Sequence, residues 1–169
     1  MPPDGGGDRM AAAPRQPRAA APAGRLLHAG CVQVGGAGVI VRGASGSGKS
    51  DLCLRLIDAG GLLVADDQVW IERDGDGGEL YASAPVGLAG LIEVRGVGIL
   101  RLPGAVGRSP VRLVVDLCPR DRVVRLPERG CADATCELLG VSLPRLGLDP
   151  FAASTCAKIG FALRVERVH

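Results

Sequence analysis

The sequence predicts an α/β fold with a strand-rich central sheet and a few flanking helices. A β-branched apolar run at residues 38–41 is followed by a glycine-rich loop, and then by apolar residues at helical spacing over 50–59. Beyond residue 60, several short apolar runs alternate with turn residues, as strands do. With 169 residues, 47% of them hydrophobic, the chain is long enough for one domain with its own core.

Composition and charge set the outer limits of the domain and of its partners. Residues 1–24 are rich in Gly, Ala, Pro and Arg without periodicity, which predicts a disordered tail, with an Arg-rich targeting sequence as the alternative. Residues 25–169 are expected to form the folded domain. A net charge of +2 and an aromatic content of 2% offer no stacking platform, so we expect no nucleic-acid partner. No apolar run approaches the length of a membrane span, so we expect no membrane association.

The six cysteines contain no C-x-x-C pair, and several of them lie in apolar runs. This pattern favours reduced core residues of a cytoplasmic protein. Cys131 and Cys136 are weak candidates for metal ligands, because no second ligand pair follows them.

The glycine-rich segment fits the pattern G-x-x-x-x-G-K-[ST] of nucleotide phosphate loops. A strand before it and a helix after it supply the required context, so its backbone N–H groups should point at a phosphate from the helix N-terminus. The compact ammonium of Lys49 suits phosphate oxygens, and Ser50 is placed for Mg²⁺. The alternative is an ordinary Gly/Ser loop. The candidate nucleotide-binding residues are Gly43, Ala44, Ser45, Gly46, Ser47, Gly48, Lys49 and Ser50.

The remaining elements are mostly strands. Gly60 and Gly61 end the first helix. Strands are predicted over residues 62–65, 69–72, 79–82, 90–103 and 111–117, and the sequence RDGDGG predicts a hairpin turn between the second and third of these. A C-terminal helix is predicted to start at Asp149 as N-cap, with Pro150 in its first turn.

Two adjacent carboxylates, Asp66 and Asp67, follow the strand at 62–65, shortly after Lys49. Neighbouring residues on an extended strand point to opposite sides, so the two should have different roles. One could act near a metal ion, and the other could accept a proton from an attacking hydroxyl. The alternative is a solvated turn at the end of a strand.

Glu93 stands between the apolar residues Ile92 and Val94, where an unpaired carboxylate is costly. Arg95 shares its face of the strand. Two interpretations stay open. The pair forms a partly buried salt bridge, or Glu93 is a metal-binding carboxylate beside a phosphate-binding Arg95, with Gly96 allowing close approach of the backbone.

Taken together, GASGSGKSDLCLRLIDAGGLLVADDQVWI and GLIEVRGVGILRL resemble the catalytic C-terminal domain of the bacterial HPr kinase/phosphorylase family. The resemblance covers residues 26–166, is strongest over 38–102, and implies the short form without the larger N-terminal domain. It implies a P-loop fold related to phosphoenolpyruvate carboxykinase and a hexameric assembly in the bacterial cytoplasm. It also implies Mg²⁺- and ATP-dependent phosphorylation of a serine on an HPr-like phosphocarrier protein, which regulates carbohydrate metabolism.

The resemblance further implies roles for single residues. Lys49 and the loop hold the nucleotide phosphates, and Ser50 and Glu93 coordinate Mg²⁺. Asp67 resembles the family's proton acceptor in the kinase direction and its donor in the reverse reaction.

Two more catalytic candidates come from the same resemblance. His28 matches the family's active-site histidine by its spacing from the loop, and a hairpin of residues 31–34 and 39–41 is expected to bring it toward the site. Arg125, in VVRLPE, matches the family's catalytic arginine.

One segment departs from the family pattern. Bifunctional members carry a Pro- and Arg-rich segment near the C-terminus, whereas residues 148–155, LDPFAAST, contain no arginine. We therefore expect weak or absent phosphorylase activity.

Two other function classes stay open: a small-molecule P-loop kinase or carboxykinase-like enzyme, and a nucleotide-binding regulator without transfer chemistry. The lack of an arginine-rich lid insertion between residues 60 and 110 argues against the first. The paired acids argue against the second, because a regulator needs no general base.

Overall fold

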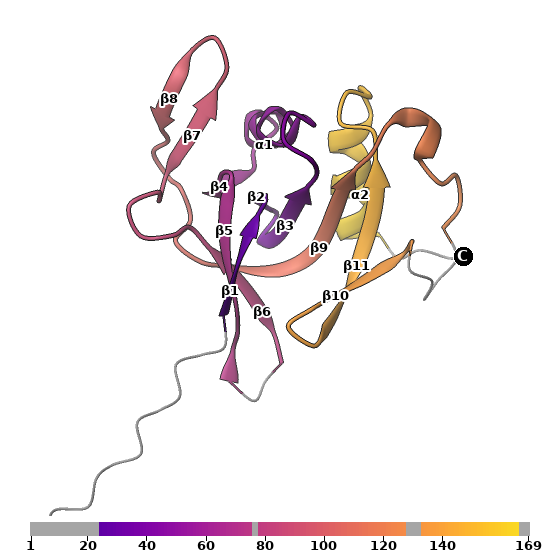
Figure 1. Cartoon of the computed structure of the whole chain (residues 1–169), viewed down its shortest axis with the longest axis horizontal. Helices are drawn as coiled ribbons and strands as arrows, with labels where there is room; N and C mark the ends of the chain where they lie inside the picture. The colour runs from indigo at the N-terminus through magenta and orange to yellow at the C-terminus, as the bar shows by residue number, and fades with distance from the viewer. Residues whose placement is uncertain (1–23, 76–77, 128–132, 166–169) are drawn as a thin grey trace, which may run out of the picture.

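The computed structural model describes residues 24–75, 78–127 and 133–165, so the predicted tail falls almost wholly outside it. Within this part of the chain, nine strands form one sheet, two form a separate hairpin, and two α-helices pack on the sheet (Figure 1). The sheet contains β1 (Gly24–His28), β2 (Gly30–Val34), β3 (Ala37–Arg42), β4 (Leu62–Ala65), β5 (Gln68–Arg73), β6 (Leu80–Ser83), β9 (Ser109–Leu117), β10 (Thr135–Leu138) and β11 (Val141–Leu148).

The remaining elements flank this sheet. The separate hairpin is β7 (Leu91–Val94) with β8 (Gly98–Arg101), and the helices are α1 (Lys49–Asp58) and α2 (Thr155–Arg164). A short 3₁₀ turn covers Arg120–Arg122. The mixed α/β class and the strand-rich sheet predicted from the sequence are confirmed.

The centre of the sheet is parallel. The strand order is β1-β5-β6-β9-β3-β2-β4, with β11 added to β9, and β9 runs parallel to both β3 and β11. The other strand pairs are antiparallel. The carboxyl ends of the three parallel strands meet at one edge, which is where open α/β sheets bind ligands.

Alternating side chains of the central strands build two cores, one on each face of the sheet. On β3, Val39 and Val41 pack with the helix side, whereas Ile40 between them packs with the strand side. The helix side includes Leu52 and Leu56 of α1. All three β3 residues are fully buried, so the strand that leads into the glycine loop is anchored in both cores.

Helix α1 forms where the apolar spacing predicted it. Leu52, Cys53 and Leu56 are buried on one face, and Gly48 precedes the helix with φ 95° in the left-handed region. Gly60, with φ 97°, follows its end, as expected for a C-terminal glycine. The predicted helix and its glycine stop are confirmed.

Two sequence predictions need correction. The run at 90–103 is not one strand but the hairpin β7–β8, because Gly96 and Gly98 adopt positive φ and turn the chain. The last helix does not start at Asp149, whose carboxylate instead accepts a hydrogen bond from the Phe151 N–H in a turn (3.0 Å). That helix begins at Thr155 after Ser154. Strands β1, β10 and β11 were not predicted from the sequence.

Two smaller findings concern the helices and the thiols. None of the described helices is long and apolar enough to cross a membrane. Cys31, Cys53, Cys118, Cys136 and Cys156 are free thiols, and the first two are buried, where burial raises the pKa of Cys31 to about 12. Cys131 lies outside the described residues.

Candidate functional site

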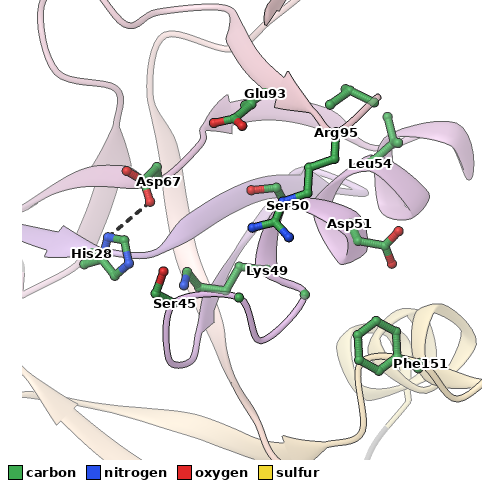
Figure 2. Close-up of a pocket in the computed structure, with 13 residues that line it drawn as sticks. His28, Ser45, Lys49, Ser50, Asp51, Leu54, Asp67, Glu93, Arg95 and Phe151 are labelled. Atoms are coloured by element: carbon green, nitrogen blue, oxygen red, sulfur yellow. Dashed lines mark ion pairs between the residues drawn. The ribbon is translucent and has the colours of Figure 1, made fainter. Parts of the chain in front are cut away.

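A pocket of about 450 Å³ opens at the carboxyl end of β3, over the glycine loop and the start of α1. Figure 2 shows its side chains converging from the loop, from β1, from the bend after β4 and from the β7–β8 hairpin. The lining residues are His28, Ser45, Gly46, Gly48, Lys49, Ser50, Asp51, Leu54, Asp67, Glu93, Val94, Arg95 and Phe151.

The glycine loop is preorganised around Lys49. This lysine is only 6% exposed, and its ammonium donates hydrogen bonds to the carbonyls of Gly43 and Ala44, both at 3.0 Å. Gly46 has φ 76°, a conformation that favours glycine. The first turn of α1 presents backbone N–H groups without intrahelical partners to the pocket. The loop therefore offers an ammonium and helix N–H donors to an anion.

Asp66 links the two sides of the pocket. Its Oδ1 accepts a hydrogen bond from Ser50 Oγ (3.0 Å), and its Oδ2 accepts one from the backbone N–H of Glu93 (3.1 Å). One carboxylate thus joins the start of α1 to the hairpin. Asp66 does not itself line the pocket, whereas Asp67 does.

Asp67 lies beside His28 in the wall of the pocket. Its Oδ1 lies 3.2 Å from Nδ1 of His28, and its backbone carbonyl accepts a hydrogen bond from Ala29 at 3.1 Å (Figure 2). The carboxylates of Asp66 and Asp67 do have different partners, as expected, but strand alternation is not the cause. Asp67 sits in a bend with φ 63°, an uncommon left-handed conformation for a residue other than glycine.

The predicted hairpin of β2 and β3 is confirmed, with Cys31 opposite Ile40. It is not what places His28, however. His28 is the last residue of β1, which pairs with β5 so that His28 lies opposite Gln68, the residue after Asp67. The β1–β5 ladder therefore sets the distance between His28 and Asp67.

The hairpin β7–β8 supplies Glu93 and Arg95. Both side chains are exposed, and neither forms an ion pair with another residue in the described part of the chain. The interpretation of a partly buried salt bridge between them is therefore wrong. Figure 2 shows Arg95 extending from the hairpin toward Ser50 and Lys49. Gly96 turns the chain directly after it with φ 81°.

Arg125 is not brought to this pocket. It is exposed and lines a second cavity of about 660 Å³, formed by the segment after β9, by β11 and by α2. The physical reason is the course of the chain: after β9 the backbone turns at Arg120–Arg122 toward α2. The expected position of Arg125 beside the phosphate loop is thus corrected.

Phe151 lines the pocket but was not singled out from the sequence. A Cβ built on Gly48 would lie 3.1 Å from the Phe151 ring, so the aromatic side chain lies against the glycine loop. The carbonyl of the preceding Pro150 accepts a hydrogen bond from Arg55 of α1, which fixes this turn. The Asp149–Pro150 pattern is the sequence signal for this turn, although it also fits the start of a helix.

The donor set fits a nucleotide with Mg²⁺. Ser50 and Glu93 provide oxygen ligands of the kind that Mg²⁺ prefers, next to the ammonium of Lys49. Within the described residues, no group of three or more His, Cys, Asp and Glu side chains is close enough to hold a metal ion by itself. Magnesium sites of this kind use one or two protein ligands together with substrate phosphates.

The comparisons with known proteins agree with this geometry. The large sheet with few helices matches the structure of the Hpr(Ser) kinase/phosphatase from Coxiella burnetii with a TM-score of 0.69 and 26% identity, covering 83% of this chain and 88% of that one. The fold is therefore that of an HPr kinase domain. Residues 21–159 match the family model of the HPr Serine kinase C-terminal domain, and the chain belongs to this family.

Curated relatives extend the comparison. The HPr kinase/phosphorylase of Geobacillus kaustophilus is 37% identical over 126 residues, which cover 71% of this chain and 40% of the relative. That of Chlorobium phaeobacteroides is 33% identical over 130 residues, covering 73% and 40%. The matched part thus spans about 40% of the length of these relatives.

Proposed function

We propose that this chain is an ATP-dependent kinase that phosphorylates a serine of an HPr-like phosphocarrier protein of the phosphotransferase system. The observation that carries the proposal is the Asp67 carboxylate, held beside His28 in the same pocket as Lys49 and the glycine loop. A protein that only bound a nucleotide would not need a carboxylate positioned there as a base. Family membership supports the choice of acceptor.

ATP is the phosphoryl donor in this proposal, in a P-loop domain related to phosphoenolpyruvate carboxykinase. Residues 43–50 hold its phosphates through the N–H groups at the start of α1 and through Lys49. The ammonium of Lys49, which donates to two loop carbonyls, is poised to donate to phosphate oxygens instead. Arg95 faces the same space from the hairpin and adds a second positive charge.

Ser50 and Glu93 would hold Mg²⁺, with Asp66 fixing both of them from behind. When bound, Mg²⁺ neutralises charge that develops on the transferred phosphoryl group. Gly96 lets the backbone beside Arg95 turn tightly, which keeps that arginine over the pocket.

In the transfer step, Asp67 accepts the proton of the serine hydroxyl while the serine oxygen bonds to the γ-phosphorus. The bond from that phosphorus to the β,γ-bridging oxygen breaks, and ADP leaves. His28, 3.2 Å from Asp67 Oδ1, orients the carboxylate. Arg125 has no part in this step, because it lines the other cavity.

The test is to incubate the full chain with labelled ATP, Mg²⁺ and an HPr-like carrier, and to locate the label. We expect one phosphoserine on the carrier. Label on a small molecule instead would support the carboxykinase-like alternative. Nucleotide binding without any transfer would support a regulator. Size measurement of the same sample tests the implied hexamer.

The reverse reaction is expected to be weak. Phosphorolysis must hold phosphoserine and inorganic phosphate together, and this needs extra positive charge. Residues 148–155 lie against the loop, but they place the Phe151 ring there and contain no arginine. The measurement is release of pyrophosphate from serine-phosphorylated carrier at millimolar phosphate, and release as fast as the forward reaction would contradict this expectation.

A further inference from the structure

Arg42, the residue that leads into the phosphate loop, takes part in an ion cluster with no role in the transfer step. Its Nε donates to Asp116 Oδ1 at 2.7 Å, and its Nη2 donates to Oδ2 at 2.8 Å. Arg145 also donates to Oδ2 of Asp116. The three side chains are 22–30% exposed, so the cluster is largely shielded from solvent.

We propose that Asp116 is a positioning residue that, by fixing Arg42, holds the entry of the phosphate loop in the geometry that binds nucleotide. The inference rests on the proposed function of the loop. Arg42 is not among the residues that line the pocket, so it acts through the backbone that follows it and not by touching phosphate.

The sheet places this cluster where the loop begins. Arg42 lies opposite Asp116 in the parallel β3–β9 pairing, and Arg145 lies on β11, the other parallel neighbour of β9. One carboxylate therefore ties the three parallel strands together, near the edge from which the loop leaves. The two-point contact with Arg42 also fixes the direction of the guanidinium, which a single hydrogen bond would not.

The next residue, Gly43, has little room to move. A Cβ built on it would lie 2.4 Å from Ser47 Oγ and 3.1 Å from the Cβ of Leu117, the neighbour of Asp116 on β9. Lys49 holds the Gly43 carbonyl from the loop side. The first peptide of the loop is thus held by β9 on one side and by the catalytic lysine on the other, so a shift of Arg42 must displace Lys49 as well.

Charge favours the same arrangement. Burial alone would raise the pKa of Asp116, but the hydrogen bonds from Arg42 and Arg145 outweigh it and hold that pKa below its usual value. The carboxylate is therefore ionised at neutral pH and keeps both arginines in place.

The test measures the affinity of the full chain for a fluorescent ADP analogue with Mg²⁺, together with thermal unfolding, in four variants. Arg42→Gln and Asp116→Asn should weaken binding about tenfold, through loss of charge-assisted hydrogen bonds at the loop entry. Arg42→Lys keeps the charge but not the two-point contact, so the loss of nucleotide affinity in this variant should be smaller. The KM for ATP should rise in these variants while the KM for the protein acceptor stays unchanged.

The matched control is Arg112→Gln. Arg112 lies on the same strand as Asp116, toward the amino end of β9, and its substitution breaks a 2.6 Å ion pair with Glu79. It should leave nucleotide affinity unchanged. A merely structural role predicts lower thermal stability with unchanged affinity in every variant.

The outcomes separate the inference from the proposed function. If the parent chain binds no nucleotide, both are overturned. If the parent binds and folded Asp116→Asn binds equally well, only the positioning role is overturned. Should Asp116→Asn fail to fold, the milder Arg42→Lys decides, and parent-like affinity in that variant overturns the inference.

Discussion

The two sides of the pocket are built very differently. The loop side rises from β3, where Val39, Ile40 and Val41 are fully buried, and it holds a lysine that is 6% exposed. The hairpin side rests on a separate two-stranded sheet, in which every residue of β8 is exposed, including Ile99 at 73%. Few buried contacts hold such an element, so it belongs to the low-stability part of a fold. The loop side is thus preformed, whereas the hairpin side has room to adjust.

This contrast predicts that changes on the loop side remove nucleotide binding, and the largest effect is expected for Lys49→Ala. Its ammonium is the central positive charge of the loop, and its loss should reduce ATP affinity below detection. The side chain is not part of either apolar core, so the fold should persist. Calorimetric titration with ATP and Mg²⁺, with circular dichroism as control for folding, checks this. Parent-like affinity in a folded variant would remove the basis for a phosphate site.

A change at the candidate proton acceptor, in the bend between β4 and β5, should spare binding and remove transfer. Asp67→Asn keeps the shape of the side chain but cannot accept the serine proton, so turnover should fall by roughly 10²–10⁴ while ATP affinity persists. The rate of transfer from labelled ATP to the carrier, under single-turnover conditions, measures this fall. Transfer at the parent rate would rule Asp67 out as the base and make Asp66 the candidate.

The loop side was also the part that the sequence predicted best. Its residues are close in sequence, from Gly43 to Ser50, and local spacing alone defines a strand, a glycine loop and a helix. The confirmed elements β3, α1 and β9 are those with strong apolar patterns. His28 and Asp67, in contrast, meet through the pairing of β1 with β5, a long-range contact that only the resemblance to a known family suggested.

The parts that the sequence did not predict share a physical cause. Strand β11 carries Pro144, Arg145 and Gly147, which break the alternation typical of strands. It forms because it pairs in parallel with β9, a contact between distant parts of the chain. Phe151 reaches the pocket because a turn, not a helix, follows Asp149. Arg125 was assigned by resemblance, and the direction of a loop after a strand cannot be read from local spacing.

Asp66 connects the loop side to the hairpin side, so Asp66→Asn should affect nucleotide binding and transfer together. The amide can still accept from one of its two partners, Ser50 or the Glu93 N–H, but the charge that holds both is lost. We expect roughly tenfold losses in both Mg²⁺-dependent affinity and transfer, since hydrogen bonds to charged groups contribute about 1.5–3 kcal/mol. Titrating activity against Mg²⁺ concentration measures this, and a loss confined to transfer would contradict the bridging role.

The smallest effect concerns acid stability, and it probes how firmly the loop side is preformed. The pKa of Asp116 is lower in the folded chain than its ordinary value, so its contribution to stability is fully present above about pH 4 and is lost as pH falls through the lower folded pKa. Asp116→Asn should therefore be less stable than the parent by on the order of 1 kcal/mol near neutral pH, and this difference in stability should shrink as the pH falls below about 4. Glu79→Gln is the control: the pKa of Glu79 is also lowered, chiefly by its hydrogen bond from Arg112, but the group is exposed and solvent screens it. Urea unfolding at several pH values gives both curves. A parent–variant gap that stays constant with pH would mean that the charge of Asp116 does not stabilise the base of the loop.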